Sequence, residues 1–484
     1  MKNIFIPLIA VFLFTGCTEK KTIKTDNISE STNDTSTVFK PANIEEQLKY
    51  HRAIEAVIWG MPAVNYDAMY QAGIRDAKAG SNQIVYWSRP EWKNQTLTPN
   101  ADALYIFPFM NTKDTGPVVL EIPPADTGSI VGTIMDCWQL ALEDVGPAGV
   151  DKGKGGKYLI LPPGYKKTVP AGYIVLQSPT YESFALLRSI PKSNSDADLA
   201  NAVTYLKRIK LYPLSETAKS PQTVFKDSYG TLFNAAIPYN MQFFKSLDRI
   251  VQTQPWMERD KALINTLASI GIQKGKPFNP DAKTQSMMLS AVKQAHEWAT
   301  NYYETQFEPF FKTSRWFVPS NPELIKDVGE GFSNPDSYPI DVRGSLFTTV
   351  FSTIKHLGAG QFYLFVTRDK NGQPLDGNKN YQLHVPANVP ARQYWSVTLY
   401  DFATHTLIRD VSHASRSSLK ADLKKNEDGS VDIYFGPKPP AGKEPNWVPT
   451  KQDGRFEAIF RLYAPDKSFF EKKTWMLPDI EEVE

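Results

Sequence analysis

PVVLEIP, at residues 117–123, is the first of four short strand-like runs that decide the fold of this 484-residue chain. SIVGTIMD (129–136), KYLILPP (157–163) and GYIVLQS (172–178) follow it, and proline and glycine separate all four. Short apolar runs punctuated in this way are typical of strands in an antiparallel β domain. We therefore predict a β-sandwich or a similar β domain in the first part of the chain.

The last third of the sequence repeats this character. Strand-like runs alternate there with turn residues such as Asn371-Gly372 and Asp376-Gly377, which favour tight turns. These runs predict a second β domain. They are QFYLFVT (361–367), NYQLHVP (380–386), YWSVTLY (394–400), SVDIYFG (430–436) and RFEAIFRLY (455–463).

A helical pattern lies between the two β regions. In residues 196–211 and 284–303 apolar side chains recur every three or four positions, which is the period of an amphipathic helix. We predict an α+β, β-rich fold, in which a mainly helical segment bridges two β-sandwich-like domains. The expected boundaries are an N-terminal β-rich domain over 41–190, a helical connector over 191–330 and a C-terminal β-sandwich-like domain over 331–484.

The N-terminus has the pattern of an export signal. MKN is followed by the apolar run IFIPLIAVFLF and then by TGC, and this run is shorter than the roughly 18 residues that a membrane-spanning helix needs. FTGC (14–17) resembles the lipobox of bacterial lipoproteins. We expect residues 1–16 to be a signal peptide and Cys17 to carry lipid such as palmitate, with an ordinary secretory signal as the alternative.

Residues 17–40 are rich in serine, threonine, asparagine and charge, so they are expected to form a flexible tether. The mature protein would then be anchored in the bacterial cell envelope, in the outer membrane, on its periplasmic or surface face. The membrane is the one partner that this pattern implies. The other cysteine in the sequence is Cys137, and we expect it to be unpaired.

Charge excludes one class of partner. The chain has 54 basic and 52 acidic residues and a formal net charge of +2, so no strong positive field attracts nucleic acid. The sequence identifies no cofactor and no oligomeric state.

Two groups of motifs resemble a known pair of families. TPNADALY (98–105), GPVVLEIP (116–123) and MDCW with VGP (135–147) resemble family 1254 of domains of unknown function. The later segments resemble family 1214, which commonly follows family 1254. The resemblance implies β-sandwich-like domains with helices between them, and it implies no reaction. The segments similar to family 1214 are DKNGQPLDGNKNYQLHVP, YWSVTLYD, NEDGSVDIYFG, PNWVPT and RLYAP.

The first of these motif groups contains candidate site residues. Asn100, Asp102 and Tyr105 lie within TPNADALY, and Asp136 ends a predicted strand beside Trp138. Two carboxylates at loop and strand ends can act as acid and base if their surroundings separate their pKa values. The alternative is that these side chains cap turns and accept backbone N–H groups.

The C-terminal strands contribute a second set of candidates. Alternation in YWSVTLY and RFEAIFRLY places Tyr400, Arg461 and Tyr463 on polar faces, opposite the apolar ones. If the two strands share a sheet, these side chains can line a groove, with Trp447 of the proline-rich loop nearby. Arginine offers a planar fork for a carboxylate or phosphate, and the aromatic rings offer stacking surface. The hypothesis is that this face turns toward the first domain; the alternative is a solvated sheet face.

The histidines do not form a recognisable metal motif. His384, His405 and His413 lie in the same β region as Asp401 and Asp410, but their spacing matches no known ligand pattern. We therefore predict surface or hydrogen-bonded histidines and no metal site, with a metal site formed on folding as the alternative. The preferred function is recognition of a small ligand, such as a carbohydrate or a lipid headgroup, in an interdomain cleft. An envelope hydrolase that uses carboxylates with tyrosine or arginine is the first alternative, and a structural or assembly lipoprotein is the second.

Overall fold

The structure is a computed structural model that describes residues 39–193, 195–219, 221–351, 353–356, 360–471 and 475–484. The predicted signal peptide, Cys17 and nearly all of the predicted tether lie outside the described residues. Residues 39–484 form one compact unit. In that part of the chain, no helix is both long and apolar enough to span a bilayer.

The N-terminal β region is a sandwich of two sheets. Their facing sides enclose a core that includes Ile106, Leu120, Ile160 and Leu187. The larger sheet has the order β11 (Phe225–Asp227), β1 (Gln83–Tyr86), β3 (Leu104–Asn111), β9 (Glu182–Ser189), β5 (Ile130–Asp136), β6 (Ala141–Val145). The smaller sheet has the order β10 (Lys210–Pro213), β4 (Val118–Ile122), β7 (Gly156–Leu161), β8 (Ile174–Gln177).

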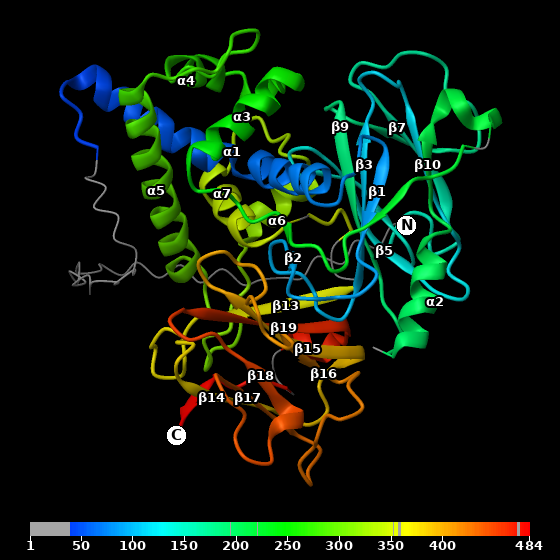
Figure 1. Cartoon of the computed structure of the whole chain (residues 1–484), viewed down its shortest axis with the longest axis vertical. Helices are drawn as coiled ribbons and strands as arrows, with labels where there is room; N and C mark the ends of the chain where they lie inside the picture. Colours follow the sequence, from blue (N-terminus) through cyan, green and yellow to red (C-terminus); the bar gives the residue numbers. More distant parts are fainter. Residues whose placement is uncertain (1–38, 194, 220, 352, 357–359, 472–474) are drawn as a thin grey trace. The chain divides into compact units, whose positions relative to one another are not determined.

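All four strand-like runs in this region are strands, but they do not form one sheet. β4, β7 and β8 lie in the smaller sheet, whereas β5 pairs with β9 in the larger one. Figure 1 shows β3 and β9 between the helices and the strands β7 and β10. The chain therefore crosses repeatedly between the two layers, as in a sandwich.

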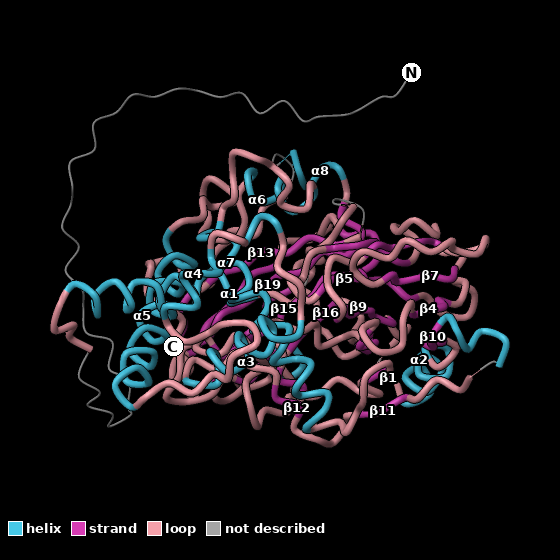
Figure 2. The backbone as a smooth tube through the Cα atoms, turned by 90° about the horizontal axis from the view of Figure 1, so that it is seen from above, coloured by secondary structure: helices cyan, strands magenta, loops and turns pink. Residues whose placement is uncertain are grey.

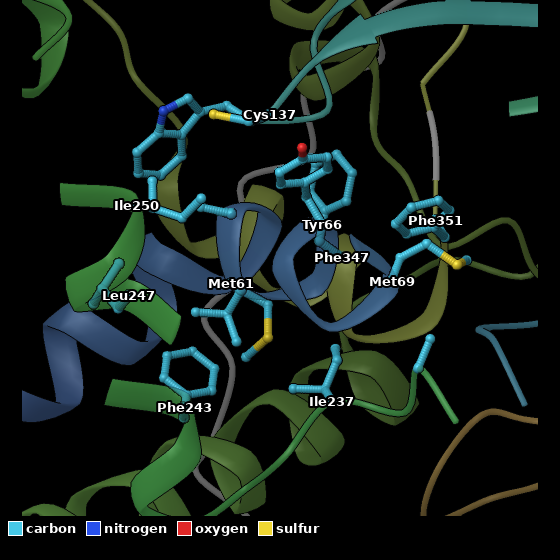
Figure 3. Close-up of a cluster of buried hydrophobic side chains, with 14 of the residues drawn as sticks. Met61, Tyr66, Met69, Cys137, Ile237, Phe243, Leu247, Ile250, Phe347 and Phe351 are labelled. Carbon is cyan, nitrogen blue, oxygen red and sulfur yellow. The ribbon is translucent and has the colours of Figure 1, made fainter. Parts of the chain in front are cut away.

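Helices cover the outer face of the larger sheet. The long helix α1 (Ile44–Arg75) begins at Asn43, whose side chain accepts a hydrogen bond from the Glu46 N–H. It continues through Pro62, because the residues after Trp59 are buried on nearly every side and packing outweighs the local signal to stop. Figure 3 shows Met61, Tyr66 and Met69 of α1 among side chains from other helices and Cys137. The other helices with labelled side chains are α3 (Met241–Thr253) and α7 (Ile340–Thr349), and α1 also packs against α4 (Leu263–Ser269) and α5 (Ala282–Thr305).

Gly60 explains how closely two of these helices approach. A Cβ atom at this position would lie only 2.9 Å from Leu247 Cδ1 on α3. The absence of a side chain lets Leu247 fill the space against α1, which a larger residue would overpack. Figures 1 and 2 place α3, α4 and α5 on the side away from β4, β7 and β10.

The predicted helical segment between the two β regions is confirmed, and it also supplies strands. The pattern at residues 196–211 begins as α2 (Asp196–Leu206) and then turns into β10, while α5 contains most of the second pattern. β10 joins β4, and β11 joins β1. Two further short strands, β2 (Asn94–Gln95) and β12 (Phe233–Asn234), pair in parallel. Such strands are too short for a periodic signal in the sequence.

The C-terminal region is a second sandwich, which confirms the predicted fold class. Its core includes Val397, Leu399, Ile433 and Phe460. One sheet has the order β13 (Gln361–Val366), β19 (Phe456–Pro465), β15 (Ala391–Asp401), β16 (Ser415–Ser417). The other has the order β18 (Trp447–Pro449), β17 (Val431–Gly436), β14 (Asn380–Val385), β20 (Glu481–Val483). Two short helices, α6 (Pro322–Gly329) and α8 (Lys467–Glu471), complete the α-helices of the described residues.

The strand alternation inferred from the sequence holds in this sheet. Trp395, Val397 and Leu399 of β15 point into the core with Phe460 and Leu462 of β19. Tyr400 and Arg461 lie on the opposite face, which contacts residues 98–100 of the N-terminal region. The polar face is therefore covered by protein and is not a solvated surface.

Candidate functional site

The motif at residues 98–105 lies at the contact between the two β regions. Asn100 lies just before β3 and is buried. Its side-chain amide donates to the hydroxyl groups of Tyr394, at 2.9 Å, and Tyr463, at 2.6 Å. Its side-chain oxygen accepts from the Asp102 N–H, and its own N–H donates to Tyr105 Oη at 2.8 Å. One asparagine thus connects the two halves and holds the loop in place.

Two more side chains of the C-terminal sheet bond to the same loop. Arg461 Nη2 donates to the Thr98 carbonyl at 2.8 Å, and Tyr400 Oη donates to the Pro99 carbonyl at 2.6 Å. The Arg461 guanidinium also lies over the rings of Tyr363 and Tyr400, 4.8 and 5.5 Å from their centroids. The sequence candidates Asn100, Tyr400, Arg461 and Tyr463 therefore meet at one place.

A cavity of about 290 Å³ lies beside this contact. Most of its wall is apolar, and it includes Leu97, Leu186, Val350 and Phe365. Polar side chains meet at one part of the wall, where β3, β9 and β13 contribute Tyr105, Arg188 and Tyr363. Arg461 is buried behind Tyr363 and does not line the cavity.

Arg188 is the charged group of this cavity. It pairs with Tyr105 across β3 and β9, and its guanidinium carbon lies 5.2 Å from the centroid of the Tyr105 ring. Its Nε is buried without a hydrogen-bond partner. Among the described residues no carboxylate forms an ion pair with Arg188 or with Arg461. A charge in an apolar setting without a counter-ion is costly, so the site favours an anion.

The tyrosines near Arg188 differ in acidity. Burial tends to raise the pKa of Tyr105, but the charge of Arg188 and the hydrogen bonds outweigh burial and lower this pKa below its ordinary value. Burial raises the pKa of Tyr400 and of Tyr463. Burial tends to lower the pKa of Arg188, because it disfavours the charged guanidinium. The nearby oxygens of Tyr105, Tyr363 and Tyr463 outweigh burial and keep this pKa above its ordinary value. The cavity therefore combines a positive charge with a phenol whose pKa that charge lowers.

Asp102 lies in the same motif, but its side chain does not line the Arg188 cavity. Its Oδ2 accepts a hydrogen bond from Ser415 Oγ at 3.3 Å, and its Oδ1 lies 3.7 Å from Lys420 Nζ. Asp102 lines a separate groove of about 250 Å³ that shares no wall residue with the Arg188 cavity. The motif at 98–105 thus contributes residues to both the Arg188 cavity and the Asp102 groove.

Asp136 and Trp138 are not brought to either hollow. Asp136 of β5 lies opposite Ser183 of β9, and Tyr105 of β3 lies opposite Arg188 of β9. These two positions are five residues apart along β9. At about 3.3 Å per residue they lie roughly 17 Å apart along the sheet. β3 and β5 both run antiparallel to β9, so the end of β5 lies far from the start of β3. The proposed cluster of Asp136 with Asn100, Asp102 and Tyr105 therefore does not form.

Asp136 has a structural role where it lies. Its Oδ1 accepts from the backbone N–H groups of Trp138 and Leu140, at 2.8 and 2.9 Å. Burial raises its pKa, against the opposing effect of Arg259 and of those two N–H groups. The Trp138 ring packs against Trp59, with 4.7 Å between centroids. The carboxylate caps a turn, which is the alternative that the sequence left open.

Trp447 and the histidines also lie away from the Arg188 cavity. Trp447 belongs to the other C-terminal sheet, and its Nε1 donates to the Gly436 carbonyl. His384 bonds to Asp432, and His405 bonds to Glu457. His413 bonds to Ser412 Oγ and to the Trp447 carbonyl. Over the described ranges, no group of three or more His, Cys, Asp or Glu is arranged to hold a metal ion.

Arg188 and Tyr363 were missed by the sequence reasoning. In ESFALLRS, alternation places Arg188 on the face of Phe184 and Leu186. A charged residue on an otherwise apolar strand face is a usable signal, since such a group needs a partner. Tyr363 gave no comparable signal, because aromatic residues are common core formers.

Two family models match the sequence. Residues 81–213 match DUF1254, and residues 360–467 match DUF1214, each described as a protein of unknown function. The predicted resemblance is therefore confirmed, and the chain carries a DUF1254 region followed by a DUF1214 region. The motif at 98–105 lies in the first region, while Tyr394, Arg461 and Tyr463 lie in the second. The Asn100 contact thus joins the two family regions.

Two solved structures are similar to this chain, and the first of them supports the fold. The VPA0106 protein from Vibrio parahaemolyticus has a TM-score of 0.55 and 18% identity, over 90% of this chain and 100% of that one. An uncharacterised protein from Burkholderia cenocepacia has a TM-score of 0.41 and 11% identity, over 91% and 96%. No curated protein matches the sequence. The similarity to the Vibrio protein shows a shared fold.

Proposed function

We propose that this DUF1254–DUF1214 protein is a cell-envelope lipoprotein that binds a small amphipathic organic acid in the cavity beside Arg188. One observation supports this proposal above all others: a guanidinium group lines a mostly apolar cavity and has no carboxylate partner among the described residues. A carboxylate headgroup would supply the missing counter-charge and accept charge-assisted hydrogen bonds.

The apolar wall supports the other half of the proposed ligand. An alkyl chain of a few carbons would displace water from Leu97, Leu186, Val350 and Phe365. Each CH₂ group that becomes buried contributes about 0.8 kcal/mol. Mostly apolar pockets with a few convergent polar groups are typical of small-molecule sites.

Octanoate tests this proposal because it has both a carboxylate and an apolar chain. We expect octanoate to bind more tightly than 1-octanol, as measured by isothermal titration calorimetry. Arg188→Met should weaken octanoate binding by about tenfold or more, because a hydrogen bond to a charged group contributes about 1.5–3 kcal/mol. Binding of 1-octanol should change little.

A matched control separates this effect from a general loss of charge. Arg52→Met removes an arginine from the exposed side of α1 and should leave octanoate binding unchanged. The proposal fails if octanoate does not bind, if it binds no better than 1-octanol, or if Arg188→Met binds it as tightly as the unmodified protein does. Native mass spectrometry of the purified protein would identify a co-purifying acid directly.

Catalysis is a second candidate, favoured by the acidity of Tyr105. A phenol whose pKa is lowered beside an arginine can exchange a proton with a molecule bound in the cavity that both groups line. Hydrolysis of p-nitrophenyl octanoate tests this possibility. Tyr105→Phe should abolish the release of p-nitrophenolate while octanoate still binds. Equal rates with and without the Tyr105 hydroxyl would exclude this role.

A further inference from the structure

The groove beside Asp102 lies on the other side of the motif at 98–105 and is not used by the proposed acid site. Its wall comes from residues 89–92, from Ala101 and Asp102, from Leu199 and from the segment 407–420 of the DUF1214 region. Its volume is about 250 Å³, which is room for a ligand about the size of one sugar ring. Because the two hollows share no wall residue, occupancy of one does not require occupancy of the other.

Asp102 has an unused acceptor in this groove. Its side chain is only 1% exposed, and its Oδ1 has no hydrogen-bond partner. Ser415 Oγ bonds to the other oxygen. A buried carboxylate oxygen without a partner costs free energy, so a donor from a bound molecule would be stabilising at this point.

The distance between Asp102 and Lys420 indicates what that donor is. Lys420 Nζ lies 3.7 Å from Asp102 Oδ1, which is too far for a hydrogen bond. Asp102 Oδ1 is buried, so a ligand reaches it when the partly exposed Lys420 side chain shifts aside; one hydroxyl oxygen can then lie within about 2.8 Å of both atoms, donating to the carboxylate and accepting from the ammonium group. A hydroxyl group is both a donor and an acceptor, whereas a carboxylate or an ammonium ion can perform only one of these tasks.

The remaining groove residues favour a neutral ligand. Two basic residues, Arg89 and Lys420, and two acidic ones, Glu91 and Asp102, line the groove. Their charges balance, so no net field selects an ion. Arg89 already forms an ion pair with Asp196.

His413 does not alter this balance. Its Nε2 donates to the Trp447 carbonyl and its Nδ1 accepts from Ser412. Burial lowers its pKa, which favours the neutral ring. The His413 nitrogens are both engaged and add no charge to the groove.

Apolar side chains supply the other feature that a sugar needs. Trp92, Leu407 and Val411 line the same groove as Asp102 and Lys420. A pyranose ring presents C–H groups on its faces and hydroxyl groups at its edge, so it matches a wall that is partly aromatic and partly polar.

We infer that the groove between residues 89–102 and 407–420 is a second binding site, which takes a neutral hydroxyl-rich ring such as a hexopyranose. One ring hydroxyl bridges Asp102 and Lys420, and a ring face packs on Trp92. This site is independent of the amphipathic-acid site.

Saturation-transfer NMR on the whole protein tests the site with methyl glycosides of D-glucose, D-galactose and D-mannose as probes. At least one glycoside should bind, and cyclohexanol, which has a ring of the same size and one hydroxyl group, should not. Asp102→Asn and Lys420→Met should each weaken glycoside binding by tenfold or more. Octanoate binding should persist in both variants, which separates this site from the first.

Lys425→Met is the matched control, because Lys425 is an exposed lysine that lies five residues after Lys420 and outside the groove. It should leave glycoside affinity unchanged. If Asp102→Asn does not fold, Lys420→Met decides the question, since the Lys420 side chain is 24% exposed and its removal leaves no cavity in the core. The inference is overturned if none of the three glycosides binds, if cyclohexanol binds equally well, or if Lys420→Met retains full glycoside affinity.

Discussion

The side-chain amide of Asn100 lies 2.6 Å from the hydroxyl of Tyr463, and this hydrogen bond joins the DUF1254 and DUF1214 regions. A second bond from the same amide reaches Tyr394, whose ring stacks on that of Tyr463 with 4.1 Å between centroids. Both tyrosines and Asn100 are buried. The contact is therefore a closed polar network, in which each member depends on the others.

Replacing Asn100 should destabilise the whole described unit. Asn100→Ala leaves two buried tyrosine hydroxyl groups without this partner, which costs about 1–3 kcal/mol in the free energy of unfolding. Urea denaturation measures the effect. Asn301→Ala, at an exposed position of α5, is the control and should change stability little. A double-mutant cycle with Tyr463→Phe should show coupling, and simple additivity would contradict the network.

A buried ion cluster beside α1 provides a second prediction. Arg249 of α3 bonds to Asp67, and its two terminal nitrogens lie 2.8 and 2.9 Å from the Glu182 carboxylate. Both carboxylates are buried. Arg249→Met leaves two uncompensated charges and should lower the free energy of unfolding by about 3–5 kcal/mol.

The control for Arg249 is an arginine with similar pairing at the surface. Arg208 forms two hydrogen bonds to Asp126, and both side chains are exposed. Arg208→Met should have a much smaller effect, because solvent screens exposed ion pairs. Equal effects of the two substitutions would contradict the view that burial makes the Arg249 cluster important.

His296 should make stability depend on pH. Burial lowers its pKa from 6.5 to about 4, with a smaller contribution from His405. The unfolded chain therefore binds more protons between these values, so the contribution of His296 to stability is complete above about pH 6.5 and is lost as pH falls toward 4. The loss can reach about 3 kcal/mol, at about 1.4 kcal/mol per pKa unit.

His296→Phe tests this dependence and keeps a ring against Tyr239, whose centroid lies 3.6 Å from that of His296. The fall in melting temperature between pH 6.5 and 4 should be smaller in this variant. His51→Phe, at an exposed position, should leave the pH profile unchanged. An identical profile for His296→Phe would mean that other groups cause the acid sensitivity.

Lipid anchoring through Cys17 is a further prediction, motivated by FTGC at residues 14–17. Cys17→Ser should release the protein from membranes, because stable anchoring requires more than one acyl chain or a second signal. Membrane fractionation measures the release, and mass spectrometry of the mature N-terminus measures the modification. An unmodified N-terminus in the unsubstituted protein would exclude a lipoprotein.

Local patterns in the sequence predicted much of the fold. The runs at 117–178 and 361–463 contain the expected strands, and alternation in YWSVTLY and RFEAIFRLY correctly separated core from polar faces. The sequence could not show that β5 leaves the sheet of β4 and β7, because strand pairing is a long-range choice. The sequence also could not show that α1 continues past Pro62, because tertiary burial stabilises this part of the helix.

The sequence by itself determined residue types and faces: a polar strand face with Tyr400, Arg461 and Tyr463, and a loop with Asn100 and Asp102. Only the tertiary structure decided which of these meet. It brought Asn100 to Tyr463, placed Arg188 at an apolar cavity and left Asp136 at the far end of β5. The physical reason is that alternation depends on neighbouring residues, whereas convergence of side chains depends on how sheets distant in sequence pack against each other.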